Sequence, residues 1–309
     1  MTRHLGIATA FLLAILPLSA AAATLCRSEL IDSVPLEIVH GQYRVQVKIN
    51  GSPVNLIVDT GSQVTVLTSA IVDHLGLPFD ESRWSTLAGV AGNGNPNHPA
   101  KVDTLSVGKL SVSDFDVQIE SDSAQGFDGI LGADVLLKGD IQIDFPDKLI
   151  SFYAPTTCRS PTIGWTTLYL PMPAQISSRS GRIILPVALN GHLIKAVLDT
   201  GASQTIVTDS AVRETGTTAN FVAGVYHTDA NGVHSAAYRT PPVSLQIGEE
   251  RFSNMPVGVE KVDLGEVDML LGLDYLQTRT LWISPNRSKI FVMQPRQAAP
   301  ILRTSVLMP

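Results

Sequence analysis

The sequence reads IVDTGSQVTVLT from Ile57 to Thr68 and VLDTGASQTIVT from Val197 to Thr208. In both stretches an apolar run precedes an Asp-Thr-Gly triplet, and a run rich in β-branched residues follows it. The two aspartates, Asp59 and Asp199, lie 140 positions apart. Two such triplets in matching settings indicate an internal duplication that can bring two carboxyl groups into one site.

Other features recur at the same spacing of 140 residues. An Asn-Gly pair at 50–51 corresponds to another at 190–191, and each lies between two apolar runs. Because Asn and Gly tolerate positive φ, each pair predicts a β-hairpin whose second strand leads into one aspartate. The apolar-apolar-Gly blocks that end at Gly132 and Gly272 also correspond. The sequence therefore predicts two tandem copies of one β-rich unit.

Each copy ends in a further strand pair, Asp140–Tyr153 in the first and Thr280–Met293 in the second. A segment rich in Pro, Thr and Ser joins the copies and is typical of a linker. The chain is long enough for two domains, each with its own core. We divide it into an N-terminal segment 1–23, lobe 1 at 24–158, a linker at 159–166, lobe 2 at 167–295 and a C-terminal tail at 296–309.

The N-terminal segment has the pattern of a signal peptide. Leu5–Leu18 is almost uninterrupted apolar sequence, and the small residues that a signal peptidase requires follow it. The apolar run is short for a membrane span, although an uncleaved anchor stays open as an alternative. We therefore expect a secreted or periplasmic mature chain with no stable membrane association.

The chain contains two cysteines, Cys26 and Cys158. In an oxidising compartment a pair of this kind is expected to form a disulfide, which here would tie the N-terminal segment to the end of lobe 1. Two unpaired thiols are the alternative.

Charge and composition narrow the classes of ligand. The formal net charge is −6, which offers no electrostatic footprint for nucleic acid. The histidines lack the close spacing of metal ligands, so we expect neither a metal nor a cofactor.

This ordered set of motifs resembles the aspartic proteases, and the retroviral-type (retropepsin-like) branch more closely than the pepsin branch. The shared pattern is an apolar-apolar-Asp-Thr-Gly loop, a glycine-containing flap hairpin, and an apolar-apolar-Gly block before a short helix. It extends from about Val34 to about Met293. The resemblance implies an all-β fold of two tandem β-barrel lobes related by a pseudo-twofold axis, each with a short helix after its apolar-apolar-Gly block.

The resemblance also implies roles for the residues of the two triplets. Asp59 and Asp199 would be the catalytic pair, sharing one proton as the carboxyls of aspartic proteases do. The threonines would hydrogen-bond across the pair, and the glycines would let backbone N–H groups approach the carboxyls. The Ser62 hydroxyl is placed to hydrogen-bond its aspartate, whereas Ala202 has no such group. The expected supporting residues are Thr60, Gly61, Ser62, Thr200, Gly201 and Ala202.

Two flaps are expected over the site, at Leu87–Asn97 and Val222–Ser235. The first is rich in glycine, as a mobile lid would be, but an ordinary exposed hairpin has the same composition. Tyr226 is a candidate to reach over the carboxyls, and a packing role is the alternative. The expected substrate-binding residues are Gly89, Val90, Gly92, Gly224, Val225 and Tyr226.

The function implied by the resemblance is an aspartic endopeptidase that acts on peptide or protein substrates. We expect a monomer with one intramolecular site. Two alternatives remain at this point: an inactive pseudoprotease that binds peptides, and an enzyme whose lobes pair between two chains.

Overall fold

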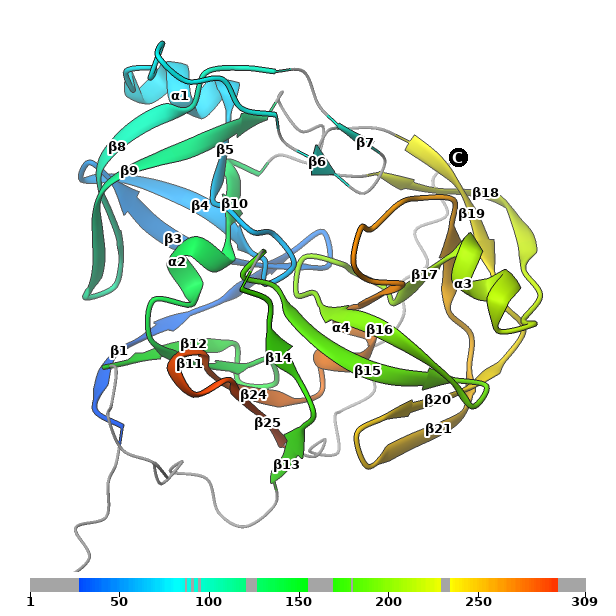
Figure 1. The fold of residues 1–309 in the computed structure, drawn as a ribbon. Coiled ribbons are helices and arrows are strands. Elements are labelled where there is room, and N and C mark those ends of the chain that lie inside the picture. The colour runs from blue at the N-terminus through cyan, green and yellow to red at the C-terminus, as the bar shows by residue number, and fades with distance from the viewer. Residues whose placement is uncertain are drawn as a thin grey trace, which may run out of the picture.

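The structure is a computed structural model that describes residues 28–86, 88–89, 92–93, 96–120, 127–154, 169–178, 180–228 and 234–293. For 88–89, 92–93, 221–228 and 234–237 only the backbone is described. The fold is mostly β, and its two lobes lie side by side above a shared sheet (Figure 1). No helix in the described ranges is long and apolar enough to cross a bilayer.

Lobe 1 is built on a seven-stranded sheet with the order β2-β3-β4-β10-β5-β9-β8. An additional pairing of β3 with β8 brings the far end of the sheet back to its beginning, which makes the lobe barrel-like. Its strands are β2 (Glu37–Val39), β3 (Gln42–Ile49), β4 (Ser52–Val58), β5 (Val66–Thr68), β8 (Ala100–Val107), β9 (Leu110–Glu120) and β10 (Gly129–Leu131).

Lobe 2 repeats this plan in a ten-stranded sheet with the order β18-β19-β22-β17-β23-β16-β15-β20-β21, with β14 paired to β15. Its strands are β14 (Gln175–Ile176), β15 (Ile183–Leu189), β16 (His192–Leu198), β17 (Ile206–Thr208), β18 (Asn220–Thr228), β19 (His234–Arg239), β20 (Val243–Ile247), β21 (Glu250–Met255), β22 (Gly258–Glu260) and β23 (Met269–Leu271). The continuous β9 of lobe 1 corresponds to β21 and β22 of lobe 2. Pro256 lies at this break, and proline cannot donate to a strand ladder.

Both predicted Asn-Gly hairpins are confirmed. Asn50 and Gly51 have φ values of 48° and 88°, and they join β3 to β4. Asn190 and Gly191 have φ values of 48° and 85°, and they join β15 to β16. Positive φ at both central residues is the geometry of the turn that matches the twist of paired strands.

The short helices predicted after the apolar-apolar-Gly blocks are α2 (Ala133–Leu136) and α4 (Leu273–Leu276). Two further helices, α1 (Ser69–Leu75) and α3 (Asp209–Glu214), follow β5 and β17. The hydroxyls of Thr68 and Thr208 accept hydrogen bonds from backbone N–H groups in their first turns, as N-caps do.

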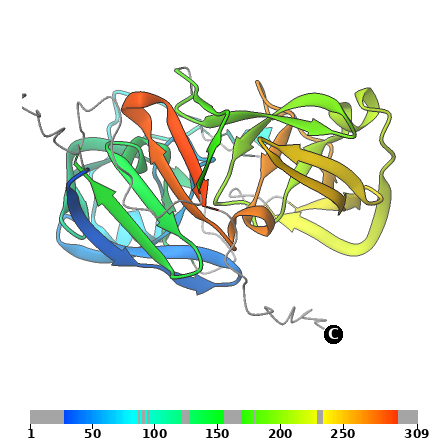
Figure 2. The ribbon, with the colours of Figure 1, turned by 90° about the horizontal axis from the view of Figure 1, so that it is seen from below.

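The last strands of each lobe combine into one six-stranded sheet. Its order is β1 (Leu30–Pro35), β12 (Leu149–Tyr153), β11 (Asp140–Asp144), β24 (Thr280–Ser284), β25 (Lys289–Met293) and β13 (Tyr169–Met172). The two predicted strand pairs are therefore confirmed, but they join across the lobes instead of closing each lobe separately. Figure 2 shows the blue and green strands of the first half beside the orange and red strands of the second.

The pseudo-twofold axis passes through the centre of this sheet. Gln142 pairs directly with Trp282, and these residues are themselves 140 positions apart. One cluster of buried apolar side chains extends through both lobes and this sheet. The segment 155–168, the tail 296–309, Cys26 and Cys158 lie outside the described residues, so the lobe boundaries and the disulfide stay predictions.

A buried ion pair fastens the two lobes at one end of the β11–β24 pairing. The Asp140 carboxylate accepts a hydrogen bond from the Ser284 hydroxyl at 2.7 Å and pairs with the Arg287 guanidinium. Arg287 lies in the short 3-10 helix η1 (Pro285–Arg287), and its Nε donates to Ser284 Oγ at 2.7 Å. The Asp140 side chain is 1% exposed, so its charge depends on these partners.

We expect Arg287→Met to lower the free energy of unfolding by about 3–5 kcal/mol, because it leaves a buried carboxylate without its cation. Urea denaturation measures this change. The matched control is Arg213→Met, which breaks the exposed i,i+4 pair with Asp209 and should cost at most ~0.5 kcal/mol. Equal losses in the two variants would show that the Asp140 pair does not fasten the lobes.

Candidate active site

The two Asp-Thr-Gly loops begin at equivalent strand ends. β4 ends at Val58, and the backbone N–H of Asp59 donates to Leu131 O at 3.1 Å. β16 ends at Leu198, and the N–H of Asp199 donates to Leu271 O at 3.0 Å. Each aspartate thus leaves the sheet beside its own apolar-apolar-Gly block, and the two side chains lie within hydrogen-bonding reach of each other.

The expected threonine contacts are confirmed, and they are reciprocal. Thr60 Oγ1 donates to Leu198 O at 2.7 Å and accepts from the N–H of Thr200 at 3.2 Å. Thr200 Oγ1 donates to Val58 O at 2.6 Å and accepts from the N–H of Thr60 at 3.0 Å. Both threonines are fully buried. Four hydrogen bonds between the lobes therefore fix the loops directly beneath the carboxyls.

Backbone donors surround both carboxyls in the same way. Asp59 Oδ1 accepts from the N–H groups of Gly61 at 2.8 Å and Ser62 at 3.0 Å. Asp199 Oδ1 accepts from Gly201 at 2.9 Å and Ala202 at 3.0 Å. Each carboxyl therefore accepts from the N–H groups at the same two positions of its own loop, and the Gly201 N–H of the opposite lobe also interacts with Asp59.

Comparisons with known proteins agree with this geometry. A family model described as aspartyl protease matches residues 45–135, and one described as gag-polyprotein putative aspartyl protease matches residues 185–278. This chain belongs to the aspartic proteases. Each matched region contains one Asp-Thr-Gly loop and one apolar-apolar-Gly block, so the protease consists of two retropepsin-like lobes in one chain.

Solved structures show the same overall plan. The aspartic proteinase from Irpex lacteus is similar in fold, with a TM-score of 0.51 and 16% sequence identity. The similarity covers 85% of this chain and 97% of that one. No match is found among the curated proteins.

Glycine is required after each threonine because the opposite loop leaves no space. A Cβ at Gly61 would lie 2.5 Å from Asp199 Cγ, and a Cβ at Gly201 would overlap the Asp59 carboxyl. An alanine at either position would therefore push the two carboxyls apart. Both glycines thus allow the opposite carboxyl to approach closely, and their own N–H groups donate to the aspartate of their own loop, as expected.

The expectation for Ser62 is wrong. Its hydroxyl donates to Val64 O at 2.8 Å, and its contact with Asp59 is made by the backbone N–H instead. A serine hydroxyl readily bonds a backbone carbonyl two residues away, and this local bond turns it from the carboxyl. Ser62 and Ala202 therefore support their aspartates equivalently.

A second pair of carboxyls, which we did not count among the site residues, supports these loops. Asp134, in the first turn of α2, accepts from the N–H and hydroxyl of Thr65 at 2.9 and 2.7 Å. Asp274 in α4 accepts from the N–H and hydroxyl of Thr205 at 3.0 and 2.6 Å, both on its Oδ1. The aspartates and the threonines of these pairs each recur 140 positions apart, and this recurrence is the sequence feature that indicates their role.

Both expected flaps are hairpins. β6 (Ala88–Gly89) pairs with β7 (Gly92–Asn93), and β18 pairs with β19, with Tyr226 opposite Ala236. In Figure 1 both hairpins lie on the side opposite the six-stranded sheet. Val90 lies outside the described residues, and the side chains around Tyr226 are not described. The substrate-binding role of Gly89, Val90, Gly92, Gly224, Val225 and Tyr226 stays a prediction.

The Asp59 and Asp199 carboxyls have different electrostatic surroundings. Burial raises the pKa of both carboxyls, and the charge of Asp59 raises the pKa of Asp199 further, well above its usual range. The N–H groups of Ser62 and Gly61 oppose the effect of burial at Asp59. Because two like charges in one site do not both ionise readily, the pair holds one proton.

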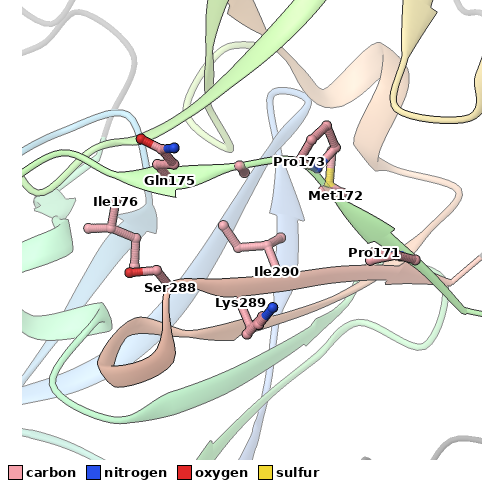
Figure 3. A pocket seen from close by; sticks show the side chains of 9 residues that line it. Pro171, Met172, Pro173, Gln175, Ile176, Ser288, Lys289 and Ile290 are labelled. Carbon is pink, nitrogen blue, oxygen red and sulfur yellow. The ribbon is translucent and has the colours of Figure 1, made fainter.

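A pocket of about 550 Å³ lies away from this pair. Figure 3 shows it between the start of β25 and the segment that joins β13 to β14, near Met172, Ile176 and Ile290. No residue of the two Asp-Thr-Gly loops lines it. Within the described ranges, no group of three or more His, Cys, Asp or Glu side chains could hold a metal ion.

We expect Asp199→Asn to stabilise the protease at neutral pH. A carboxyl whose pKa is raised on folding contributes stability below its unfolded pKa, about 3.9, and this contribution is lost as pH rises through the folded pKa. The variant carries no such charge, so its melting temperature should exceed that of the wild type at pH 7 and approach it at acidic pH. Thermal unfolding between acidic and neutral pH measures this difference, and Asp103→Asn, at an exposed position of β8, is the control. Parallel curves for Asp199→Asn and the wild type would contradict the shared-proton pair.

Proposed function

We propose that Asp59 and Asp199 of a single chain form the catalytic pair of this aspartic endopeptidase. The observation that supports the proposal is the position of the two carboxyls, which face each other on loops joined by reciprocal threonine hydrogen bonds. A peptide bond of a peptide or protein substrate would be cleaved between them.

In the mechanism we propose, Asp199 holds the shared proton, because burial and the neighbouring Asp59 both raise its pKa. Ionised Asp59 accepts a proton from a water molecule, and the water oxygen attacks the carbonyl carbon of the scissile bond. Protonated Asp199 donates its proton to the carbonyl oxygen, which becomes the second hydroxyl of a neutral tetrahedral intermediate. When this intermediate collapses, Asp59 returns its proton to the leaving nitrogen and Asp199 regains the hydroxyl proton. The chemistry therefore ends in the starting protonation state.

Two alternatives are less well supported. A pseudoprotease that only binds peptides has no use for a buried pair of like charges, which destabilises the folded chain at neutral pH. Pairing of lobes between two chains would require the six-stranded sheet and the four threonine hydrogen bonds to form between molecules. Within one chain they are already complete, so we propose a monomer.

We expect the wild type to cleave a denatured protein at acidic pH, to lose activity as pH rises, and to be inhibited by pepstatin. Asp59→Asn and Asp199→Asn should each lower kcat by at least about a thousandfold, because the reaction needs one carboxyl to accept a proton and the other to donate one. The control is Asp103→Asn. Full activity in either dyad variant would exclude this catalytic pair.

Co-expression of the two dyad variants separates the monomer from the lobe-paired dimer. In a dimer that exchanges lobes, one of the two sites would combine the intact aspartates and regain activity. An intramolecular site cannot be restored in this way, so we expect the mixture to remain inactive.

We also propose that the protease is exported and that residues 1–23 are removed, which the signal-peptide pattern supports. The intact mass of the purified protein should correspond to a chain that begins near Thr24 and that has lost two hydrogens through a Cys26–Cys158 disulfide. A mass that includes the N-terminal segment would contradict export by cleavage, and a mass unchanged by reduction would contradict the disulfide.

A further inference from the structure

One side chain of lobe 1 reaches the catalytic loop of lobe 2. Gln42 is the first residue of β3, and its Nε2 donates to Gly201 O at 2.7 Å. Only the NH₂ end of an amide can donate to a carbonyl oxygen, so the chemistry fixes the orientation of the Gln42 side chain. Among the described residues its buried Oε1 has no hydrogen-bond partner, which makes this a costly position for a residue with only a packing role.

The carbonyl that Gln42 contacts belongs to the peptide group between Gly201 and Ala202. The N–H of this same peptide group donates to Asp199 Oδ1 at 3.0 Å. Because a peptide group is planar, a bond that fixes its oxygen also fixes the direction of its N–H. A hydrogen bond accepted by the oxygen also polarises the N–H and strengthens it as a donor. Gln42 is thus connected to the Asp199 carboxyl through a single rigid unit.

In the described residues of the other lobe, no side chain makes the equivalent connection. Arg182 occupies the position 140 residues after Gln42, at the base of β15. Its guanidinium lies 3.4 Å from Leu264 O and 3.8 Å from the Glu266 carboxylate. In the described part of the chain, no hydrogen bond joins Arg182 to the carbonyl of Gly61. The Gly61–Ser62 peptide group, whose N–H donates to Asp59, is therefore not held by Arg182 in the way that Gln42 holds the Gly201–Ala202 peptide group.

We propose that Gln42 is a positioning residue that holds the Gly201–Ala202 peptide on Asp199 and thereby favours the ionised form of that carboxyl. The proposal rests on the catalytic role proposed for Asp59 and Asp199. The bond is present at only one of the two aspartates, and its effect opposes the protonation of Asp199 that burial and the Asp59 charge favour.

The direction of the effect on pH dependence follows from the groups around Asp199. Burial and the Asp59 carboxylate favour protonated Asp199, whereas the N–H groups of Ala202 and Gly201 favour the anion. The Arg239 guanidinium also approaches this loop, where it donates to Gln204 Oε1 at 2.6 Å. Loss of the Gln42 bond weakens the Ala202 donor, so the last proton of the pair should leave at a higher pH.

The test compares Gln42→Met, which keeps the length of the side chain but has no donor, with Gln42→Lys, which restores a donor and adds a positive charge. With a quenched fluorescent peptide cleaved by the wild type, kcat and KM are measured between pH 3 and 8. We expect Gln42→Met to lower kcat about three- to tenfold at little change in KM and to move the alkaline limb up by ~0.3–1 pH unit. Gln42→Lys should move the same limb down.

Gln46→Met is the matched control, because Gln46 is exposed on the same strand. A lower kcat in Gln42→Met with the alkaline limb unmoved would indicate a merely structural role and overturn the proposal, as would behaviour identical to the wild type. If Gln42→Met does not fold, as judged by its melting temperature, the direction of the shift in Gln42→Lys decides. Inactivity of the wild type, or full activity of Asp199→Asn, would refute the catalytic pair instead, so the two failures are distinguishable.

Discussion

The reciprocal contact of Thr60 and Thr200 is the constraint on which the rest of the site depends. Each threonine uses its hydroxyl both to accept from its counterpart's N–H and to donate to a carbonyl of the opposite lobe. All of these groups are buried, so breaking one bond would leave a polar group without water to replace its partner. This rigid base allows two carboxyls to stay close although their charges repel.

The six-stranded sheet also holds the two carboxyls close together, although it lies farther from them. It joins the closing strands of both lobes, and its central pair, Gln142 and Trp282, lies on the pseudo-twofold axis together with the threonines. The Asp140–Arg287 ion pair joins the two lobes at one end of the β11–β24 pairing. A rotation of one lobe against the other would have to break contacts at both levels, so the separation of the carboxyls is fixed by the whole fold and not by the loops alone.

Much of this arrangement could be predicted from the sequence because it depends on local and repeated patterns. The Asn-Gly turns require positive φ, and the strands before Asp59 and Asp199 each end in three apolar residues, so both features appear at a fixed spacing. The pairing of β11 with β24 could not be predicted in this way, because the sequence of neither strand indicates which strand it pairs with. The Ser62 hydroxyl was misassigned because two acceptors compete for it, and only the three-dimensional positions decide between Val64 and Asp59. The connection from Gln42 to Gly201 spans 159 residues and has no matching residue at position 182, so the repeat concealed it.

The difference between Gln42 and Arg182 has a consequence for how a polypeptide lies in the cleft. A strictly twofold site presents identical surroundings on either side of the bond that is cut, so a chain can enter with its amino end toward either half. Here one half holds an uncharged amide against the opposite loop, and the other holds a guanidinium beside a carboxylate. The two ways of laying down a substrate are then different complexes with different free energies. The two halves of the duplicated chain are therefore not interchangeable around the site.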